Sequence, residues 1–489
     1  MTQRRTYHPE RNTLMIFNWL SRSRGSRTTS MLALTEAAEQ IRTRRISPLE
    51  LTRECLSRIE RLNPILNAFI TVTSDLALEE ARQAEAEVMA GNWRGPLHGI
   101  PIGLKDLLDV SGVRTTAASN QFCNRIATDN RSCNRFATND AQLVKLLKRS
   151  GAVIVGKLNL HEFAFGMSGI VSAFGPVSNP WDIERITGGS SSGSAAAVAA
   201  GLCVAAIGSD TAGSIRCPAA LCGIVGHRPS AGLLSAEGMV PLAPSFDTAG
   251  PMTQNVRDAA VLLEILSGAP IMDGLDASVS TLRVGVPRKD FFADLHPEVE
   301  TCLEAALAVV SKLVAEVREV NLEVARCRTV FDAEIYEYHE KMAAETPELY
   351  QPSTLFRVRK CAGISASDYI RARRELQQQR HAAESVFQRV DVLITPTTPA
   401  PAPRISDLFP LAEPELRNFE TKYLMRNTSP FSVLYWPSTS VPCGFTTEGL
   451  PVGMQISGRP GQDAAVLRLA YAYEKATEWH SNKIETDWA

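Results

Sequence analysis

Short apolar runs alternate with helix-like segments along most of this chain, and this pattern constrains its fold more than any other feature. The runs typical of buried strands lie at residues 99–105, 151–159, 203–210, 282–287, 391–397, 438–445 and 451–456. Segments with helical periodicity lie at residues 139–151, 195–202, 256–268 and 464–479. This alternation predicts an α/β fold with a substantially buried sheet.

The ends of the alternating region predict the domain boundaries. Three helices are expected within residues 34–91, the second starting at Pro48 behind a serine cap, and long helical stretches are expected from Pro297 to about Arg389. No Pro/Ser/Gly-rich linker divides this region, so we expect one large domain over residues 31–489. Residues 1–30 carry six arginines against one acidic residue, and we expect them to form a disordered or extended tail.

Composition excludes several classes of function. The chain is 44% hydrophobic and 21% charged with a net charge of −2, so neither nucleic acid nor a membrane surface is an expected partner. No apolar run approaches the length of a membrane span. The ten cysteines are scattered, which favours free thiols in a cytoplasmic protein over disulfides or a metal site. A ten-residue repeat over residues 123–142 is expected to be a duplicated surface loop.

Three familiar motifs do not fit their usual chemistry here. GAVIVGKL resembles a phosphate-binding loop, but Leu158 stands where a magnesium ligand is needed, so no nucleotide cofactor is expected. Gly189–Gly193 matches G-x-S-x-G, but a polar, proline-containing segment precedes it instead of a buried strand. His161 and His227 are more typical of structural histidines than of a catalytic base. We expect neither a metal nor a cofactor.

A second serine-containing segment is better suited to catalysis. GSDTAGSIRCPA (208–219) follows an apolar strand, and its small residues allow a tight turn that points several backbone N–H groups one way. A serine hydroxyl needs a base, and a lysine held neutral by burial can serve. Lys105 follows an apolar strand and fits this role, although Lys105 taken alone is better explained as a surface lysine at a strand end.

Four blocks in this order resemble the amidase signature family: GIPIGLKD, GPVSNPWDIERITGGSSSGSAAAVAAG, GSDTAGSIRCPAALCGIVG and SFDTAGPM. The resemblance implies a single α/β domain around a central mixed, many-stranded sheet covered by helices on both faces. It also implies a Ser–cis-Ser–Lys triad in which Ser214 is the nucleophile, Ser190 the relay in a cis peptide and Lys105 the base. The backbone N–H groups of Thr211, Ala212, Gly213 and Ser214 would form the oxyanion hole.

The implied function is hydrolysis of a carbon–nitrogen bond, in an amide or a carbamate, through an acyl-enzyme on Ser214. The alternative is a glutaminase-type A subunit of a tRNA-dependent amidotransferase, which needs a partner subunit. That subunit is expected to carry an acidic residue where this chain has Met425, which counts against glutamine. A non-catalytic interaction protein on the same scaffold is the third alternative.

Departures from the family pattern bear on the substrate. The usual second glycine pair is Ser192-Gly193 here, and N-L-x-G-x-P becomes Ser432–Pro437, with Tyr435 in place of the glycine. We expect Tyr435, Trp436 and Ser191 to line the substrate pocket and to favour a small aromatic or apolar amide. The chain is expected to act as a monomer or homodimer.

Overall fold

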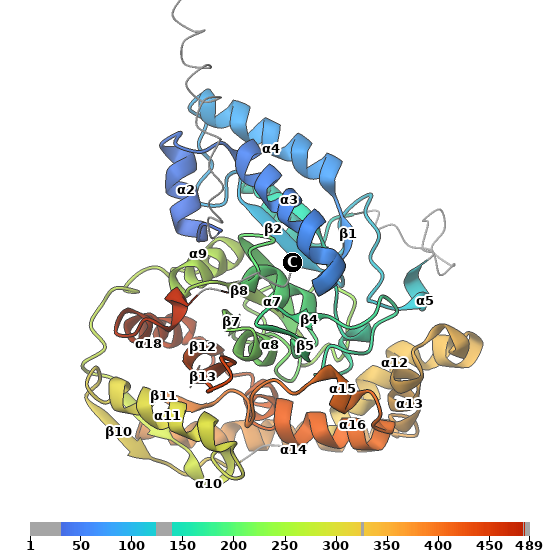
Figure 1. The fold of residues 1–489 in the computed structure, drawn as a ribbon. Helices are drawn as coiled ribbons and strands as arrows, with labels where there is room; N and C mark the ends of the chain where they lie inside the picture. Colours follow the sequence, from blue (N-terminus) through green and yellow to red (C-terminus); the bar gives the residue numbers. More distant parts are fainter. Residues whose placement is uncertain (1–30, 124–138, 324–326, 483, 485–489) are drawn as a thin grey trace, which may run out of the picture. The chain divides into compact units, whose positions relative to one another are not determined.

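The computed structural model describes residues 31–123, 139–323, 327–482 and 484. Residues Leu32–Ala489 form one compact unit, built around an eleven-stranded sheet in the described part of the chain (Figure 1). The prediction of an α/β fold with a central mixed sheet is therefore confirmed. The tail predicted over residues 1–30 and most of the repeat, residues 124–138, lie outside the described residues.

The sheet mixes parallel and antiparallel pairs. Its order is β1-β3-β2-β6-β8-β7-β12-β13-β11-β9-β10, and β4 and β5 form a separate antiparallel pair. β2 is parallel to both β3 and β6, β9 is parallel to β10 and β11, and the other pairs are antiparallel. The strands are β1 Phe69–Val72, β2 Pro101–Lys105, β3 Val153–Leu158, β4 Ser178–Asn179, β5 Asp182–Ile186, β6 Ala205–Asp210, β7 Val225–Arg228, β8 Thr248–Thr253, β9 Arg283–Val286, β10 Glu316–Glu319, β11 Val392–Pro396, β12 Ser438–Phe445 and β13 Pro451–Gly458.

Helices fill the connections between the strands. They are α2 Leu34–Arg42, α3 Pro48–Leu66, α4 Ser74–Met89, α5 Asn120–Cys123, α6 Gln142–Arg149, α7 Ser192–Ala199, α8 Arg216–Leu221, α9 Val256–Ser267, α10 Arg288–Phe291, α11 Pro297–Val310, α12 Arg328–Glu345, α13 Pro352–Lys360, α14 Ala366–Ala383, α15 Ile405–Leu408, α16 Glu413–Phe419, α17 Ser429–Val433 and α18 Asp463–Lys475. A π-helical turn, Glu420–Met425, follows α16, and 3₁₀ turns lie at Glu162–Ala164, Pro347–Leu349, Glu384–Gln388 and Trp479–Ser481.

Helices cover both faces of the sheet, as the resemblance implied. A Cβ placed on Gly453 of β13 would touch α8, whereas one placed on Gly458 would touch Val466 of α18. Because the two glycines are five residues apart and side chains alternate along a strand, α8 and α18 lie on opposite faces. α9 packs beside α18 (Figure 1).

Small residues bring α7 close to the sheet. Ala195, Ala196, Ala197 and Val198 are completely buried and share one apolar cluster with residues of β3 and β6. The helix begins three residues earlier than the segment 195–202 predicted for it, at Ser192. Its polar first turn therefore lies against the sheet as well, beside the serines expected to be catalytic.

The sequence-based element prediction missed several strands. β7 has only four residues, two of which are His227 and Arg228, and β8 contains glycine and proline, so neither shows the apolar run that marks a buried strand. The stretch expected to be helical after Pro297 is interrupted by β10, whose residues Glu316–Glu319 alternate charge with a valine at the sheet edge. Edge strands often carry charged residues, which hides them from a search for apolar runs.

Candidate active site

Lys105 ends β2 in the interior of the protein. All five residues of β2 are buried, because β2 lies between its parallel neighbours β3 and β6, and Lys105 itself has no exposed surface. The adjacent carboxylate, Asp106, does not pair with it, since Asp106 forms a buried ion pair of 2.6 Å with Lys157 of β3. Lys105 is therefore left without a carboxylate in direct contact among the described residues.

The amine of Lys105 lies between two serine hydroxyls. Its Nζ donates to Oγ of Ser190 at 2.7 Å and to Oγ of Ser209 at 2.8 Å. Burial lowers the pKa of Lys105 to about 7, although the negative charges of Asp210 and Asp247 act in the opposite direction. A substantial fraction of Lys105 is thus neutral near pH 7 and able to accept a proton.

Ser190 sits in the loop that leads into α7. The Gly189–Ser190 peptide bond is cis. The carbonyl of Ser190 accepts from the N–H of His161 at 3.1 Å, and the next N–H, that of Ser191, donates to the carbonyl of Ser214 at 3.2 Å. These backbone bonds place the Ser190 loop beside the Ser214 loop.

Asp210 shapes the loop that carries Ser214. Its carboxylate accepts from the N–H of Gly213 at 2.8 Å and from the N–H of Ile215 at 3.2 Å, which curls the chain around it. Arg216 and Arg228 form buried ion pairs with the same carboxylate and hold the pKa of Asp210 well below its usual range, against the effect of burial. The carboxylate is thereby committed to the loop and cannot act as a proton acceptor.

Ser214 faces a cavity. Its Oγ donates to Sδ of Met167 at 3.6 Å, and within the described residues no hydrogen bond joins Ser214 to Ser190. The structure therefore brings Lys105, Ser190 and Ser214 into one site but shows the Lys105–Ser190 contact alone. Reaching Ser190 requires the Ser214 hydroxyl to leave Met167.

The four N–H groups expected to form an oxyanion hole are not equivalent. The N–H of Gly213 is already bonded to Asp210, whereas those of Thr211, Ala212 and Ser214 have no acceptor among the described residues. The loop is braced on both sides, because Thr211 Oγ1 donates to Asp247 at 2.6 Å and the carbonyl of Ala212 accepts from Thr428 at 2.8 Å. Three braced N–H groups remain available near Ser214.

The cavity at Ser214 has a volume of about 660 Å³. One part of its lining is the Ser214 loop with Met167, and another consists of aromatic side chains, those of Phe165, Phe246, Phe291 and Phe331. Charged residues complete the lining: Asp290, Arg328, Arg357, Arg417, Glu420, Lys422 and Arg426. The site can therefore hold a molecule with both apolar and charged groups.

The residues expected to line the pocket lie elsewhere. Ser191 is buried, and its Oγ accepts from the N–H of Ser209 at 3.2 Å. Trp436 is fully buried against Phe387, with ring centroids 4.6 Å apart. Tyr435 has its ring covered by the guanidinium of Arg380 at 3.2 Å, and its φ of +66° is the conformation that favours the glycine of the family pattern. The cavity lining contains none of the three, so the expectation of a purely aromatic or apolar substrate loses its basis.

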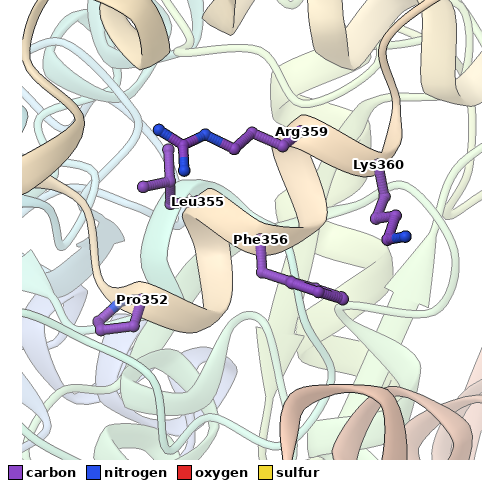
Figure 2. Close-up of a pocket in the computed structure, with 5 residues that line it drawn as sticks. All are labelled: Pro352, Leu355, Phe356, Arg359 and Lys360. Atoms are coloured by element: carbon purple, nitrogen blue, oxygen red, sulfur yellow. The ribbon is translucent and has the colours of Figure 1, made fainter.

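A second, more open hollow of about 460 Å³ lies over α13. Figure 2 shows its five lining side chains, all from this helix: Pro352, Leu355, Phe356, Arg359 and Lys360. Its lining contains no residue of the predicted site. Arg357 of the same helix is instead buried and faces the cavity at Ser214.

Neither histidine weighed as a base can act as one here. Burial lowers the pKa of His161 to about 3, and its Nδ1 accepts from the N–H of Gly169 at 3.3 Å. His227 lies between Thr439 and Asp463, at 2.7 Å and 3.1 Å, and is not part of the cavity lining. Among the described residues, no group of three or more His, Cys, Asp or Glu side chains could hold a metal ion, and no helix is long and apolar enough to cross a membrane.

Comparison with known proteins identifies relatives along nearly the whole chain. The model of the family described as Amidase matches residues 50–467. The chain is 37% identical over 495 residues to the A subunit of glutamyl-tRNA(Gln) amidotransferase from Roseiflexus sp. (strain RS-1), covering 92% of this chain and 97% of the relative. A crystal structure of an amidase superposes with a TM-score of 0.80 at 34% identity, covering 91% of this chain and 99% of that one. The peptide amidase of Stenotrophomonas maltophilia superposes with a TM-score of 0.79 at 29% identity, covering 93% and 98%.

Proposed function

Because the chain belongs to the amidase family, whose members hydrolyse carbon–nitrogen bonds, we propose that it cleaves a carboxamide through an acyl-enzyme on Ser214. The observation that carries this proposal is the position of the Lys105 amine. It is fully buried, has a pKa of about 7 and bonds Ser190 at 2.7 Å, beside the loop of a serine that faces a cavity. A neutral lysine next to two serines provides a proton acceptor for a hydroxyl nucleophile.

The proposed reaction begins when the Ser214 hydroxyl turns from Met167 towards Ser190. Neutral Lys105 takes the proton of Ser190 while Ser190 takes that of Ser214, and Ser214 Oγ attacks the substrate carbonyl carbon. The N–H groups of Thr211, Ala212 and Ser214 stabilise the oxyanion of the tetrahedral intermediate. The proton then passes back to the leaving nitrogen, the carbon–nitrogen bond breaks, and water repeats the sequence on the acyl-enzyme.

Labelling and turnover together test this proposal. A fluorophosphonate probe is expected to label Ser214, as located by peptide mass mapping, and to leave the Ser214→Ala variant unlabelled. Lys105→Ala is expected to lower amide turnover by about 10²–10⁴-fold, the usual contribution of a general base, while retaining the fold. Unchanged labelling in Ser214→Ala, or unchanged turnover in Lys105→Ala, would remove the residue from its role.

A second candidate is the glutamine-hydrolysing subunit of an amidotransferase. The curated relative at 37% identity carries that name, which favours this candidate, and the charged lining of the cavity suits the zwitterion glutamine. Met425 lines the cavity at the position where an acidic residue is expected for glutamine, which counts against it. The solved structures named as an amidase and as a peptide amidase favour the first candidate instead, since neither name describes a subunit.

A substrate panel separates the two candidates. The full chain alone is assayed with glutamine, aliphatic amides, anilides and carbamates, with Ser214→Ala as the blank. Turnover of simple amides or carbamates without glutamine favours a free-standing amidohydrolase. Glutamine turnover that appears only after the other subunits of such an amidotransferase are added favours the second candidate.

A further inference from the structure

We infer that the substrate carries an anionic group, such as a carboxylate, which Arg417, Lys422 and Arg426 bind in the cavity at Ser214. This inference deepens the proposed function and rests on it for the identity of the cavity as the active site. All three cations line that cavity, together with Ser214 and Met167. In the part of the chain that the structure describes, no carboxylate forms an ion pair with any of the three.

Two other cations of the cavity are already paired. Arg357 contacts Glu420 at 2.8 Å and also bonds Glu413, and its side chain is 3% exposed. Arg328 contacts Asp332 at 2.6 Å. The second oxygen of Glu420 accepts from the N–H and hydroxyl of Ser168 at 2.9 and 2.7 Å. Three carboxylates, those of Glu413, Glu420 and Asp332, therefore pair with these two cations and leave neither of them as an unpaired positive charge for a ligand.

The remaining three cations exceed the remaining acids. Among the described residues, no carboxylate lies within ion-pair distance of Arg417, Lys422 or Arg426. Arg426 donates a hydrogen bond to the carbonyl of Ala293 and interacts electrostatically with Asp294 at longer range. Asp290 is the one further carboxylate of the lining. Arg417 and Arg426 are partly buried and Lys422 is exposed. Three cations against one carboxylate in the lining of one cavity attract an anion more strongly than the same charges spread over an open surface.

The three cations come from one short stretch of the chain. Arg417 lies in α16, Lys422 lies in the π-helical turn Glu420–Met425, and Arg426 follows that turn directly. Asn418, Glu420, Thr421 and Met425 of the same stretch also line the cavity, so this stretch forms one wall of it.

A small carboxylate fits this site better than a polyanion. The cations line the same cavity as the nucleophile, and its volume of about 660 Å³ is that of a small-molecule site. The side chains of Asn418, Thr421 and Ser429, which can donate hydrogen bonds, also line the cavity and come from the same part of the chain. We therefore assign the anion to the substrate amide itself.

Binding to the inactive full-length Ser214→Ala protein tests the inference without turnover. The probes are glutaramate, pentanamide and 5-aminopentanamide, three amides of equal chain length that differ in end charge, titrated calorimetrically at constant low ionic strength. Glutaramate is expected to bind at least about tenfold more tightly than pentanamide, and 5-aminopentanamide more weakly than either. Equal binding of the three, or no detectable binding of glutaramate, overturns the inference.

Matched variants locate the anion site. Combining Arg417→Gln, Lys422→Gln and Arg426→Gln in the Ser214→Ala protein is expected to abolish the binding preference for glutaramate over pentanamide. Arg359→Gln with Lys360→Gln, which removes two cations from the α13 hollow in Figure 2, is expected to preserve it. If the triple variant does not fold, Lys422→Gln alone, at an exposed position, is expected to reduce the preference by about threefold. A preference that survives in the folded triple variant, or that is unchanged in Lys422→Gln, contradicts the assignment.

The outcome is separable from that of the proposed function. If wild-type protein hydrolyses pentanamide and glutaramate equally well and binds them equally, the proposed chemistry stands and the anion site falls. If Ser214→Ala binds glutaramate preferentially but wild-type protein hydrolyses no amide, the anion site stands and the proposed chemistry falls.

Discussion

Lys105 can accept a proton only while its amine is neutral, so the activity of the proposed enzyme should depend on pH. Burial lowers the pKa of Lys105 to about 7, which means that the amine is mostly charged below pH 7 and mostly neutral above it. We expect kcat/KM for a neutral amide to rise with pH and to level off above a midpoint near 7. A profile that is flat from pH 5 to 9 would contradict the role of Lys105 as base.

Ser209 is expected to position Lys105 and to support its charged form. Its Oγ accepts from Lys105 Nζ at 2.8 Å, so Ser209→Ala removes an acceptor that stabilises the ammonium. The midpoint of the pH profile should move below that of wild type, and kcat/KM on its plateau should fall by about tenfold as the amine loses its fixed position. Ser209→Thr, which retains the hydroxyl, should restore both. An unchanged midpoint in Ser209→Ala would reduce Ser209 to a packing residue.

Residue-scale prediction from sequence was uneven for physical reasons. Lys105, Ser190 and Ser214 occur in motifs whose order and spacing can be read along the chain. Ser209 and Met167 act through space, and no spacing marks them, although Ser209 lies next to the Asp210 turn at the end of a predicted strand. The pocket residues Tyr435 and Trp436 were misplaced because a motif shows where a backbone turns and not which way its side chains face.

At the scale of elements, the first turn of α7 has no room for added atoms. A Cβ on Gly193 would lie 2.3 Å from the carbonyl oxygen of Ala68 and 2.6 Å from the backbone nitrogen of Asn159. We expect Gly193→Ala to lower the free energy of unfolding by about 1–3 kcal/mol, because backbone atoms must shift. Thermal or urea unfolding would measure the loss.

The neighbouring residue provides the control for Gly193. Among the described residues, Ser192 makes one long side-chain hydrogen bond, in which its Oγ donates to the carbonyl of Asn159 at 3.5 Å. Ser192→Gly, which restores the glycine of the family pattern, should therefore cost less than about 1 kcal/mol. If Ser192→Gly is as destabilising as Gly193→Ala, close packing at residue 193 is not what constrains this turn.

Helices and strands that begin or end at characteristic residues could be predicted from sequence. Those whose geometry depends on the surrounding structure could not. The start of α3 was recognised from Ser47 and Pro48, and the structure confirms a capping box in which Ser47 and Glu50 satisfy each other's backbone N–H groups. The π-helical turn Glu420–Met425 has no comparable signal, since its residues are compatible with a continuous α-helix. That Arg417, Lys422 and Arg426 line the same cavity as Ser214 could not have been predicted from sequence.

At the scale of the whole molecule, the sheet order joins segments that are far apart in the chain. β7 pairs with β12 about 210 residues later, and their register, Thr439 opposite His227, depends on neither strand alone. Local patterns therefore predicted the fold class and the resemblance implied the mixed sheet, but the order of the strands needed the structure. The same long-range pairing assembles the groups around Asp210.

Asp210 links the Ser214 loop to the centre of the sheet, and its removal should affect both. Its carboxylate contacts Arg216 at 2.9 Å and Arg228 at 3.3 Å, and Arg216 also reaches Gln455 of β13 and Ser432 of α17. Asp210→Asn leaves two buried guanidinium groups without a counter-charge, which should cost about 3–5 kcal/mol of folding free energy. The loop of Ser214 also loses a charged acceptor for two of its N–H groups.

The thermal unfolding temperature of Asp210→Asn and its extent of fluorophosphonate labelling are therefore both expected to be lower than in the wild type. The comparison is Glu39→Gln, which removes an exposed i,i+3 ion pair with Arg42 and should leave both measurements unchanged, since exposed pairs contribute little. Because Asp210 touches β6, β7, α8 and the Ser214 loop, loss of labelling with an unchanged unfolding temperature would mean that the loop is organised independently of the sheet. Loss of neither would mean that the two arginines are neutralised by other groups, and the electrostatic account of this loop would fail.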